Sequence, residues 1–218
     1  MNLKQILTII MRKKGKVSFL SQLDNDSSVL DVGCGLNSPF NFKKILPKAK
    51  YTGIDIVEYN KSEHIFCDKY ISASPRNFTE EILKLKNTFD AVVCSHNIEH
   101  CDDREGAFKA MLDSLKIGGS IYLSFPCEKS INFPKREGTL NYFDDNTHQD
   151  MPPKFQVLID ELKKNNFEII FSTQHNKPIF LWLIGLITEP YSKYKKKVLK
   201  GTWEYYGFES IIWAQKIK

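Results

Sequence analysis

Between residues 28 and 125, short apolar runs alternate with segments whose apolar positions recur at helical spacing. Residues 89–95 form the strongest run, because they are almost continuously apolar, as in a strand buried on both faces. The predicted strands cover 29–32, 51–56, 64–68, 89–95 and 121–125, and the predicted helices cover 39–46, 79–86 and 102–116. Strands that alternate with helices form a parallel sheet, so the pattern predicts a doubly wound α/β fold.

The pattern is less regular on either side of this stretch. Residues 127–153 show no period, and a connection of that length is often functional. After it the pattern predicts a helix over 153–165, a strand over 167–173, an amphipathic helical insertion over 178–200 and a last strand over 208–217. Before residue 28, one helix ending at Gly15 and a short one over 17–23 are expected. We therefore predict a single domain over 1–218, in which 1–27 is a helical extension.

Composition narrows the class of protein. The chain has 218 residues, of which 42% are hydrophobic and 26% charged, as in an ordinary folded domain. The five cysteines include no C-x-x-C, which argues against a disulfide framework or a cysteine zinc site and favours a reducing, cytoplasmic location. The longest apolar run, 179–187, is far shorter than the roughly 20 residues of a membrane span. A net charge of +5 does not by itself predict nucleic-acid binding.

A glycine-rich turn follows the first predicted strand, in the order Asp31-x-Gly33-x-Gly35, and Ser38-Pro39 then reads as a helix start. Ser38 stands where a dinucleotide fingerprint has its third glycine, and no phosphate-binding P-loop pattern is present. Asp55, 22 residues beyond Gly33, ends the next strand and is placed to bind a ribose diol. A glycine turn with two acids suits a nucleoside that carries an amino acid, and S-adenosylmethionine is such a molecule.

Four segments resemble the motifs of class I S-adenosylmethionine-dependent methyltransferases, in particular small-molecule enzymes of the type 11 and 12 branches. The segments are VLDVGCG (29–35), YTGIDI (51–56), FDAVVCSHNIEH (89–100) and LKIGG (115–119). The resemblance implies a Rossmann-like sheet of seven strands, with helices on both faces and the last strand antiparallel. It also implies these cofactor contacts: Asp31, Gly33, Cys34 and Gly35 at the methionine part, Asp55 at the ribose, Ile56 and Asp68 at the adenine, and Ser95 and His96 beside the sulfonium. For Asp68, a solvated loop acid is the alternative.

Residues 96–100 also read H-x-x-E-H, the inverted signature of zinc proteases. That chemistry needs both histidines on one helix face as metal ligands. Here the motif directly follows a predicted buried strand, where the resemblance implies a loop beside the methyl donor. We therefore disfavour a metalloprotease and predict no metal ligands.

Transfer to a hydroxyl group benefits from a base, and a histidine suits that role at neutral pH. His96 and His100 follow the fourth strand, and His148 lies in the long loop, where Asp144 precedes it by four residues and is expected to orient its ring. The loop resembles those of sugar and other small-molecule methyltransferases, so we predict a hydroxyl or amine acceptor on a sugar or glycoconjugate precursor. The alternatives are an RNA methyltransferase, disfavoured because no N-P-P-Y-type motif follows the fourth strand, and a protein that binds the cofactor without transferring the methyl group.

Residues 126–153 and 178–206 are the segments expected beside the acceptor, and we hypothesise that 178–200 caps it with Trp182 and Tyr191 as apolar walls. Basic residues follow in the same segment, namely Lys193, Lys195, Lys196, Lys197 and Lys200. An apolar helix beside such a cluster can bind an anionic, nucleotide-linked or lipid-linked acceptor, or lie on a membrane surface. The alternative is a solvated helix end whose apolar face is packed. The oligomeric state is not predicted.

Overall fold

The computed structural model describes residues 6–7, 10–11, 14–56 and 66–218. Its centre is a seven-stranded sheet in the order β3-β2-β1-β4-β5-β7-β6. The strands are β1 (Ser28–Val32), β2 (Lys50–Asp55), β3 (Lys69–Ser72), β4 (Phe89–Ser95), β5 (Leu115–Pro126), β6 (Phe167–Thr173) and β7 (Glu209–Lys216). Strands β1 to β5 pair in parallel, and β7 is antiparallel to both of its neighbours. The predicted fold class and the antiparallel last strand are confirmed.

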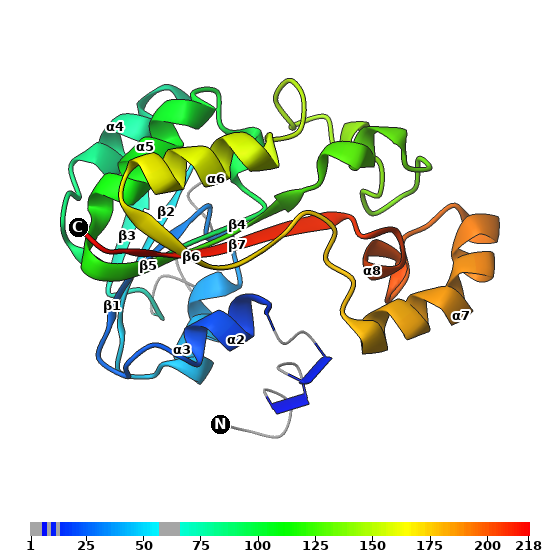
Figure 1. Ribbon diagram of the computed structural model, residues 1–218, viewed down its shortest axis with the longest axis horizontal. Helices are drawn as coiled ribbons and strands as arrows, with labels where there is room; N and C mark the ends of the chain where they lie inside the picture. The colour runs from blue at the N-terminus through cyan, green and yellow to red at the C-terminus, as the bar shows by residue number, and fades with distance from the viewer. Residues whose placement is uncertain (1–5, 8–9, 12–13, 57–65) are drawn as a thin grey trace.

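Helices cover both faces of the sheet, as Figure 1 shows. Helices α4 (Phe78–Leu83), α5 (Arg104–Ser114) and α6 (Phe155–Lys164) lie on one face, and α2 (Lys16–Leu20) and α3 (Ser38–Ile45) lie on the other. Each face has its own buried cluster of apolar side chains. Helix α6 shows how a helix contributes to such a cluster. Its apolar positions recur at helical spacing and are all buried, namely Phe155, Leu158, Ile159 and Leu162.

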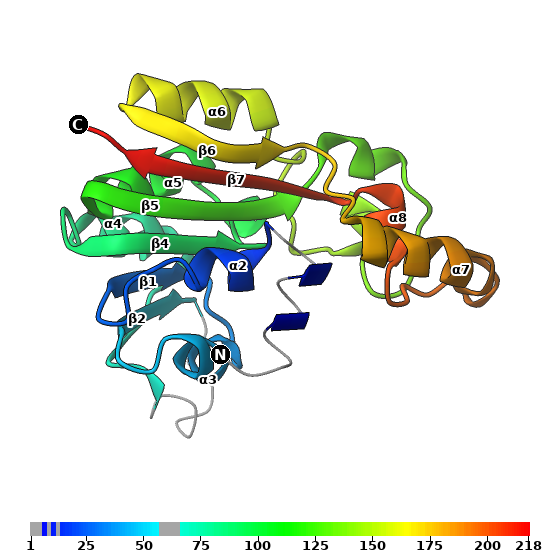
Figure 2. The ribbon, with the colours of Figure 1, turned by 60° about the horizontal axis from the view of Figure 1, so that its bottom comes forward.

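Helices α7 (Ile179–Lys195) and α8 (Thr202–Tyr206) lie beyond the carboxyl end of β4, to the side of the sheet (Figure 2). The long connection before α6 also passes there, with short 3₁₀ turns η4 (Glu128–Asn132) and η5 (Tyr142–Asp144). In a doubly wound sheet, ligands bind outside the carboxyl ends of the strands, where the strand order reverses. Here that point lies between β1 and β4.

Three local predictions were wrong. The third strand is Lys69–Ser72, so Asp68 precedes it instead of ending it. The helix start expected at Ser38-Pro39 has Asn37 as its N-cap, and the hydroxyl of Ser38 donates a hydrogen bond to Asp31. The strand predicted over 121–125 begins earlier, at Leu115, directly after α5, and has an irregular register against β4.

The predicted N-terminal helix falls partly outside the described residues; within it, residues 6–7 and 10–11 are helical. Among the residues that the structure describes, no helix is long and apolar enough to cross a membrane.

Candidate functional site

The glycine turn after β1 leaves open space at the reversal point of the sheet. Gly33 and Gly35 have φ of +70° and +60°, a region that favours glycine. A Cβ on Gly33 would lie 2.2 Å from the side chain of Asn97, whereas a Cβ on Gly35 would have no atom within 4 Å. The loop after β4 thus packs against the first glycine, and the second faces space that a ligand can enter.

Asp55, at the end of β2, meets this turn. Its carboxylate is 6% exposed and accepts hydrogen bonds from the backbone N–H groups of Gly35, at 2.8 Å, and Ile56, at 2.7 Å. Ile56 is half exposed and lines a small pocket together with Asn97 and His100. The structure therefore gathers the glycine turn, Asp55 and Ile56 at one place, as the sequence predicted.

The carboxylate of Asp31, near the end of β1, is hydrogen-bonded to protein side chains. Its carboxylate is 1% exposed and accepts hydrogen bonds from the Lys16 ammonium, the Ser38 hydroxyl and the Tyr51 hydroxyl. Three protein donors from α2, α3 and β2 therefore take up the oxygens predicted for the ligand's methionine part. The neighbouring Cys34 is also buried, and this burial raises the pKa of its thiol. Both side chains are therefore buried in the protein next to the glycine turn.

Asp68 does not lie at the predicted adenine position. Its carboxylate accepts hydrogen bonds from the backbone N–H of Tyr51, at 2.7 Å, and the ammonium of Lys43, at 2.6 Å. Tyr51 stands near the beginning of β2, whereas Asp55 stands at its end. Asp68 is thus at the amino end of the parallel strands, opposite the glycine turn, because the third strand begins after it and not before it.

The exit of β4 carries Ser95 and His96. The Ser95 hydroxyl lies 3.0 Å from that of Ser124 on the neighbouring strand, and the side chain is half-buried. His96 has a φ of +51°, which turns its ring away from the path of the strand. Both predicted cofactor contacts therefore stand at the carboxyl edge of the sheet.

The ring of His96 is fixed on every side. Its nitrogens lie 3.2 Å from a carboxylate oxygen of Glu99 and 3.2 Å from one of Glu209, and the ring stacks on Phe208 and touches Trp203. Burial alone would lower the pKa of His96, but the hydrogen bonds with Glu209 and Glu99 raise it to about 10. The imidazolium donates from both nitrogens, so His96 does not have the geometry of the predicted base.

Glu99, His100 and His148 form a compact cluster, with one potential ligand atom of each side chain within 4.8 Å of the others. The carboxylate of Glu99 is fully buried, and its Oε2 has no hydrogen-bond partner. The rings of His100 and His148 lie 4.8 Å apart, centroid to centroid. The sequence predicted the two histidines as candidate catalytic residues, and the structure brings them together with a third side chain from the H-x-x-E-H segment.

Each histidine of the cluster is oriented through Nδ1. His148 Nδ1 lies 2.5 Å from the carbonyl oxygen of Tyr142, and its ring stacks on that of Tyr142. His100 Nδ1 lies 2.9 Å from the hydroxyl oxygen of Thr147, which donates its own hydrogen to Asp145 at 2.6 Å. In both cases Nδ1 is the donor, so Nε2 carries the lone pair in the neutral ring.

Backbone contacts attach the loop of His148 to the exit of β4. The N–H of Gln149 donates to the carbonyl of Glu99 at 2.9 Å, and the guanidinium of Arg104 donates to the carbonyls of Gln149 and Met151, both at 2.9 Å. Asp144 does not orient His148 as predicted. Its carboxylate instead accepts backbone hydrogen bonds within its own loop, in the capping box of η5.

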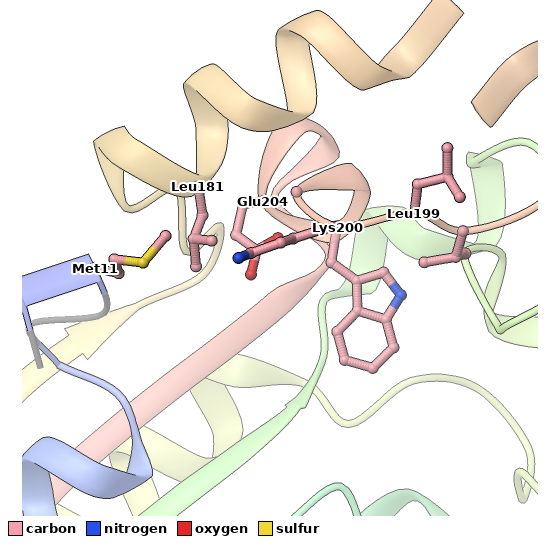
Figure 3. Close-up of a pocket in the computed structure, with 8 residues that line it drawn as sticks. Met11, Leu181, Leu199, Lys200 and Glu204 are labelled. Atoms are coloured by element: carbon pink, nitrogen blue, oxygen red, sulfur yellow. The ribbon is translucent and has the colours of Figure 1, made fainter. Parts of the chain in front are cut away.

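A cavity of about 320 Å³ opens beside this edge, between α7, α8 and the helical residues 10–11 (Figure 3). Its lining consists of Met11, Leu181, Val198, Leu199, Lys200, Gly201, Trp203 and Glu204. Trp203 joins the cavity to the site, because its ring lies 5.2 Å from that of His96. The insertion does border a cavity, but Leu181, Leu199 and Trp203 form the walls in place of the predicted Trp182 and Tyr191.

Sequence reasoning missed Arg104, Thr147 and Asn97. For Arg104 a signal was present, since a cation in the first turn of a helix is unfavourable beside the positive end of the helix dipole. An arginine there indicates another partner. The contacts of Thr147 with His100 and of Asn97 with Gly33 join residues that lie far apart in the sequence, so no local pattern predicts them.

A sequence model of the family described as "Methyltransferase domain" matches residues 10–171. An uncharacterized protein of Methanocaldococcus jannaschii is 31% identical over 123 residues, which are 52% of this chain and 33% of that protein. The human mitochondrial ubiquinone biosynthesis O-methyltransferase is 34% identical over 106 residues, which are 44% of this chain and 28% of the enzyme. The chain thus matches only about a third of the length of these curated relatives. A solved S-adenosylmethionine-dependent methyltransferase from Mesorhizobium loti has the same fold, with a TM-score of 0.62, 15% identity, and coverage of 92% of this chain and 97% of that one.

Proposed function

The chain belongs to the methyltransferase-domain family, and we propose that it transfers a methyl group from S-adenosylmethionine to a hydroxyl group of a small-molecule acceptor. One observation carries the proposal. The open glycine Gly35 and the buried carboxylate of Asp55 meet at the reversal point of the sheet, with a hydrogen bond of 2.8 Å between them. A glycine turn and an acid in this arrangement fit a nucleoside that carries an amino acid.

In this proposal the backbone of the glycine turn lies against the methionine part, Asp55 accepts from the ribose hydroxyls, and Ile56 covers the adenine. Ser95 and Asn97 stand at the exit of β4, on the side of the methyl group. When bound, the cofactor supplies an activated methyl group, so that the S–CH₃ bond breaks toward sulfur while the acceptor oxygen forms the new bond and its proton is released. The rest is positioning, which by itself accounts for much of the rate in such displacements.

The proposed acceptor enters through the cavity beside α7 and α8, and its hydroxyl comes to rest near His100 and His148. These imidazoles would promote the loss of the acceptor's proton. The similarity to a human O-methyltransferase supports oxygen over an amine as the methylated atom. A sugar or glycoconjugate precursor stays a prediction within this class of acceptor.

The binding of S-adenosylhomocysteine, measured by calorimetry, tests the proposal. Asp55→Ala should weaken binding by about 100-fold, because a hydrogen bond to a charged group contributes about 1.5–3 kcal/mol. Asp68→Ala is the matched control, since this acid lies at the opposite end of the same strands and should leave the affinity unchanged. Equal affinity of Asp55→Ala and the unmodified protein would refute the ribose role, and no binding to the unmodified protein would refute the function.

We also propose that α7 lies on an anionic membrane surface and that the acceptor is lipid-linked. The helix exposes large apolar side chains, each at least 43% accessible: Ile179, Phe180, Leu183, Leu186, Ile187, Tyr191 and Tyr194. One face of α7 is packed, since Leu181, Gly185, Glu189 and Ser192 are buried, but the exposed apolar side chains favour membrane contact over the alternative of a fully packed apolar face. The lysines of the predicted basic cluster lie at the end of α7 and directly after it, and all of them are exposed. Lys197 also pairs with Glu137. Apolar residues beside lysines support contact with acidic lipid headgroups.

Co-sedimentation with vesicles tests this second proposal. At low salt the protein should pellet with phosphatidylserine-containing vesicles and not with purely neutral ones. Ile187→Glu should reduce this binding, since Ile187 is 79% exposed, and should leave the thermal midpoint nearly unchanged. Glu168→Gln, on the distant strand β6, serves as a control for surface charge. Failure to bind acidic vesicles would refute the membrane contact without affecting the proposed chemistry.

A further inference from the structure

We infer that Glu99, His100 and His148 bind one divalent transition-metal ion, such as Zn²⁺, at the edge of the cofactor site. The role of this ion in methyl transfer rests on the proposed function, whereas the binding itself does not. The sequence predicted no metal ligands, and the one metal motif that it contains, H-x-x-E-H, would have paired His96 with His100. The structure gathers a different set.

The cluster contains an acceptor without a hydrogen-bond donor. Oε2 of Glu99 is buried without a hydrogen-bond partner, and a buried carboxylate oxygen in that state is costly. The Nδ1 groups of His100 and His148 donate to Thr147 and to the Tyr142 carbonyl, so the lone pair of each neutral ring is on Nε2. One potential ligand atom of each of the three residues lies within 4.8 Å of the others, and a cation bound between them would satisfy all three.

Each candidate ligand is held in place by a second group of the protein. A metal-binding histidine usually donates its other ring N–H to a carbonyl, a carboxylate or water, which fixes the ring and increases its basicity. His148 has the carbonyl of Tyr142, and His100 has the hydroxyl of Thr147, which is bonded in turn to the carboxylate of Asp145. The second carboxylate oxygen of Glu99 is held by His96. Every ligand thus has an orienting partner.

The ligand set indicates the kind of ion. Two imidazole nitrogens and one carboxylate oxygen suit Zn²⁺ and neighbouring first-row ions, whereas Mg²⁺ and Ca²⁺ prefer oxygen ligands. Three protein ligands also leave coordination positions open. His100 shares a pocket with Ile56 and Asn97, so the cluster borders the proposed cofactor site.

An ion there would bind the acceptor's hydroxyl oxygen and lower its pKa. The proton would pass to solvent, the oxygen would form its bond to the methyl carbon, and the electron pair of the broken S–C bond would stay on sulfur. The histidines would then act as ligands and not as the direct base.

Titration of the chelator-treated protein with Zn²⁺ tests the inference. We expect one high-affinity ion per chain. His148→Ala should weaken binding more than about 100-fold, and Thr147→Val, which removes only the orienting hydroxyl, should weaken it by about 10–100-fold. His175→Ala is the matched control, because this histidine lies near the carbonyl of Gly207, outside the cluster, and should change nothing. With Co²⁺, absorption bands without thiolate-to-metal charge transfer would identify nitrogen and oxygen ligands.

Three results would overturn the inference: no tight Zn²⁺ binding, binding that His148→Ala leaves intact, or a cobalt spectrum dominated by thiolate. Titration of the same variants with S-adenosylhomocysteine separates this failure from failure of the proposed function. Cofactor binding without Zn²⁺ binding would refute the metal site alone. Zn²⁺ binding without cofactor binding would refute the function and leave the metal site standing.

Discussion

Two arginines fasten the second half of the chain, and they differ in what they bind. Arg104 donates to three uncharged backbone carbonyl oxygens, those of Ile98, Gln149 and Met151. Arg136 is 5% exposed and binds the carboxylate of Glu189 through two hydrogen bonds, of 2.7 and 2.6 Å. Arg104 holds the loop of His148 against the β4 exit, whereas Arg136 holds α7 beside the long loop.

The difference follows from what surrounds each arginine. An arginine bonded to Glu99 would neutralise the buried carboxylate that lies in the cluster with His100 and His148. Arg104 avoids this by binding carbonyls, so it fixes the loop without neutralising the site. Arg136 and Glu189, by contrast, neutralise each other in a buried pair that Ser192 and Tyr206 complete. The contacts of Arg104 leave the carboxylate of Glu99 without an arginine partner, whereas Arg136 and Glu189 cancel each other's charge.

The largest effect is expected from Arg136→Met. The variant leaves the carboxylate of Glu189 buried and unpaired, and breaking a buried pair from one side costs about 3–5 kcal/mol. Urea denaturation should show this loss of the free energy of unfolding. The double variant with Glu189→Leu should recover most of it, because two apolar side chains replace the pair; no recovery would mean that the ion pair is not the cause.

Arg104→Met should have a smaller effect on stability, about 1.5–3 kcal/mol, because hydrogen bonds to a charged group contribute on that scale. Its effect on the cluster should be larger, since the loop that carries His148 loses its attachment. Zn²⁺ affinity should fall while the affinity for S-adenosylhomocysteine stays the same. A parallel loss of both affinities would show that Arg104 supports the whole edge of the sheet.

Tyr206→Phe should destabilise the protein by about 0.5–1.5 kcal/mol, the usual contribution of one hydrogen bond. The variant removes only the hydroxyl that donates to Glu189 at 2.7 Å and keeps the ring against Phe133. Thermal unfolding measures the change. A loss as large as that of Arg136→Met would mean that the hydroxyl, and not the guanidinium, satisfies the buried carboxylate.

The smallest expected effect is a loss of stability at acidic pH. Burial alone would raise the pKa of Glu189, but hydrogen bonds from Arg136 and Tyr206 lower it below its ordinary value. A carboxyl with a lowered pKa in the folded state stabilises the protein above its unfolded pKa, about 4.3, and loses this contribution as the pH falls through the folded pKa. The unmodified protein should therefore lose stability below about pH 4.3 relative to the Arg136→Met, Glu189→Leu double variant. Parallel curves would contradict the lowered pKa.

The sequence was most informative where structure depends on local pattern. The runs 89–95 and 167–173 were predicted with the bounds of β4 and β6, because a buried strand is a compact apolar run and a half-exposed edge strand alternates apolar and polar residues. Strand β3 is short, with only Tyr70 and Ile71 between its polar ends, so a nearby apolar run was chosen in its place. That single shift put Asp68 at the wrong end of the sheet.

The cluster of Glu99, His100 and His148 was predicted only in part, for a physical reason. The H-x-x-E-H reading assumes a helix, in which residues four apart share a face. Here Ile98–His100 is one 3₁₀ turn and His96 has a left-handed backbone, so the two histidines of the motif point to different partners. His148 joins through a loop contact 48 residues away, and no periodicity encodes such a contact.

The contact between His96 and Glu209 has a consequence for the order of folding. Glu209 begins β7, which inserts between β5 and β6, and β7 is the strand with which β6 pairs. During synthesis, β1 to β5 can pair early, but the ring of His96 lacks one of its carboxylates, and β6 lacks its neighbour, until residues 209–216 have emerged. Until β7 has been made, the edge of β5 with which it pairs is exposed. The carboxyl end of β4 therefore gains its full set of contacts only after β7 joins the sheet.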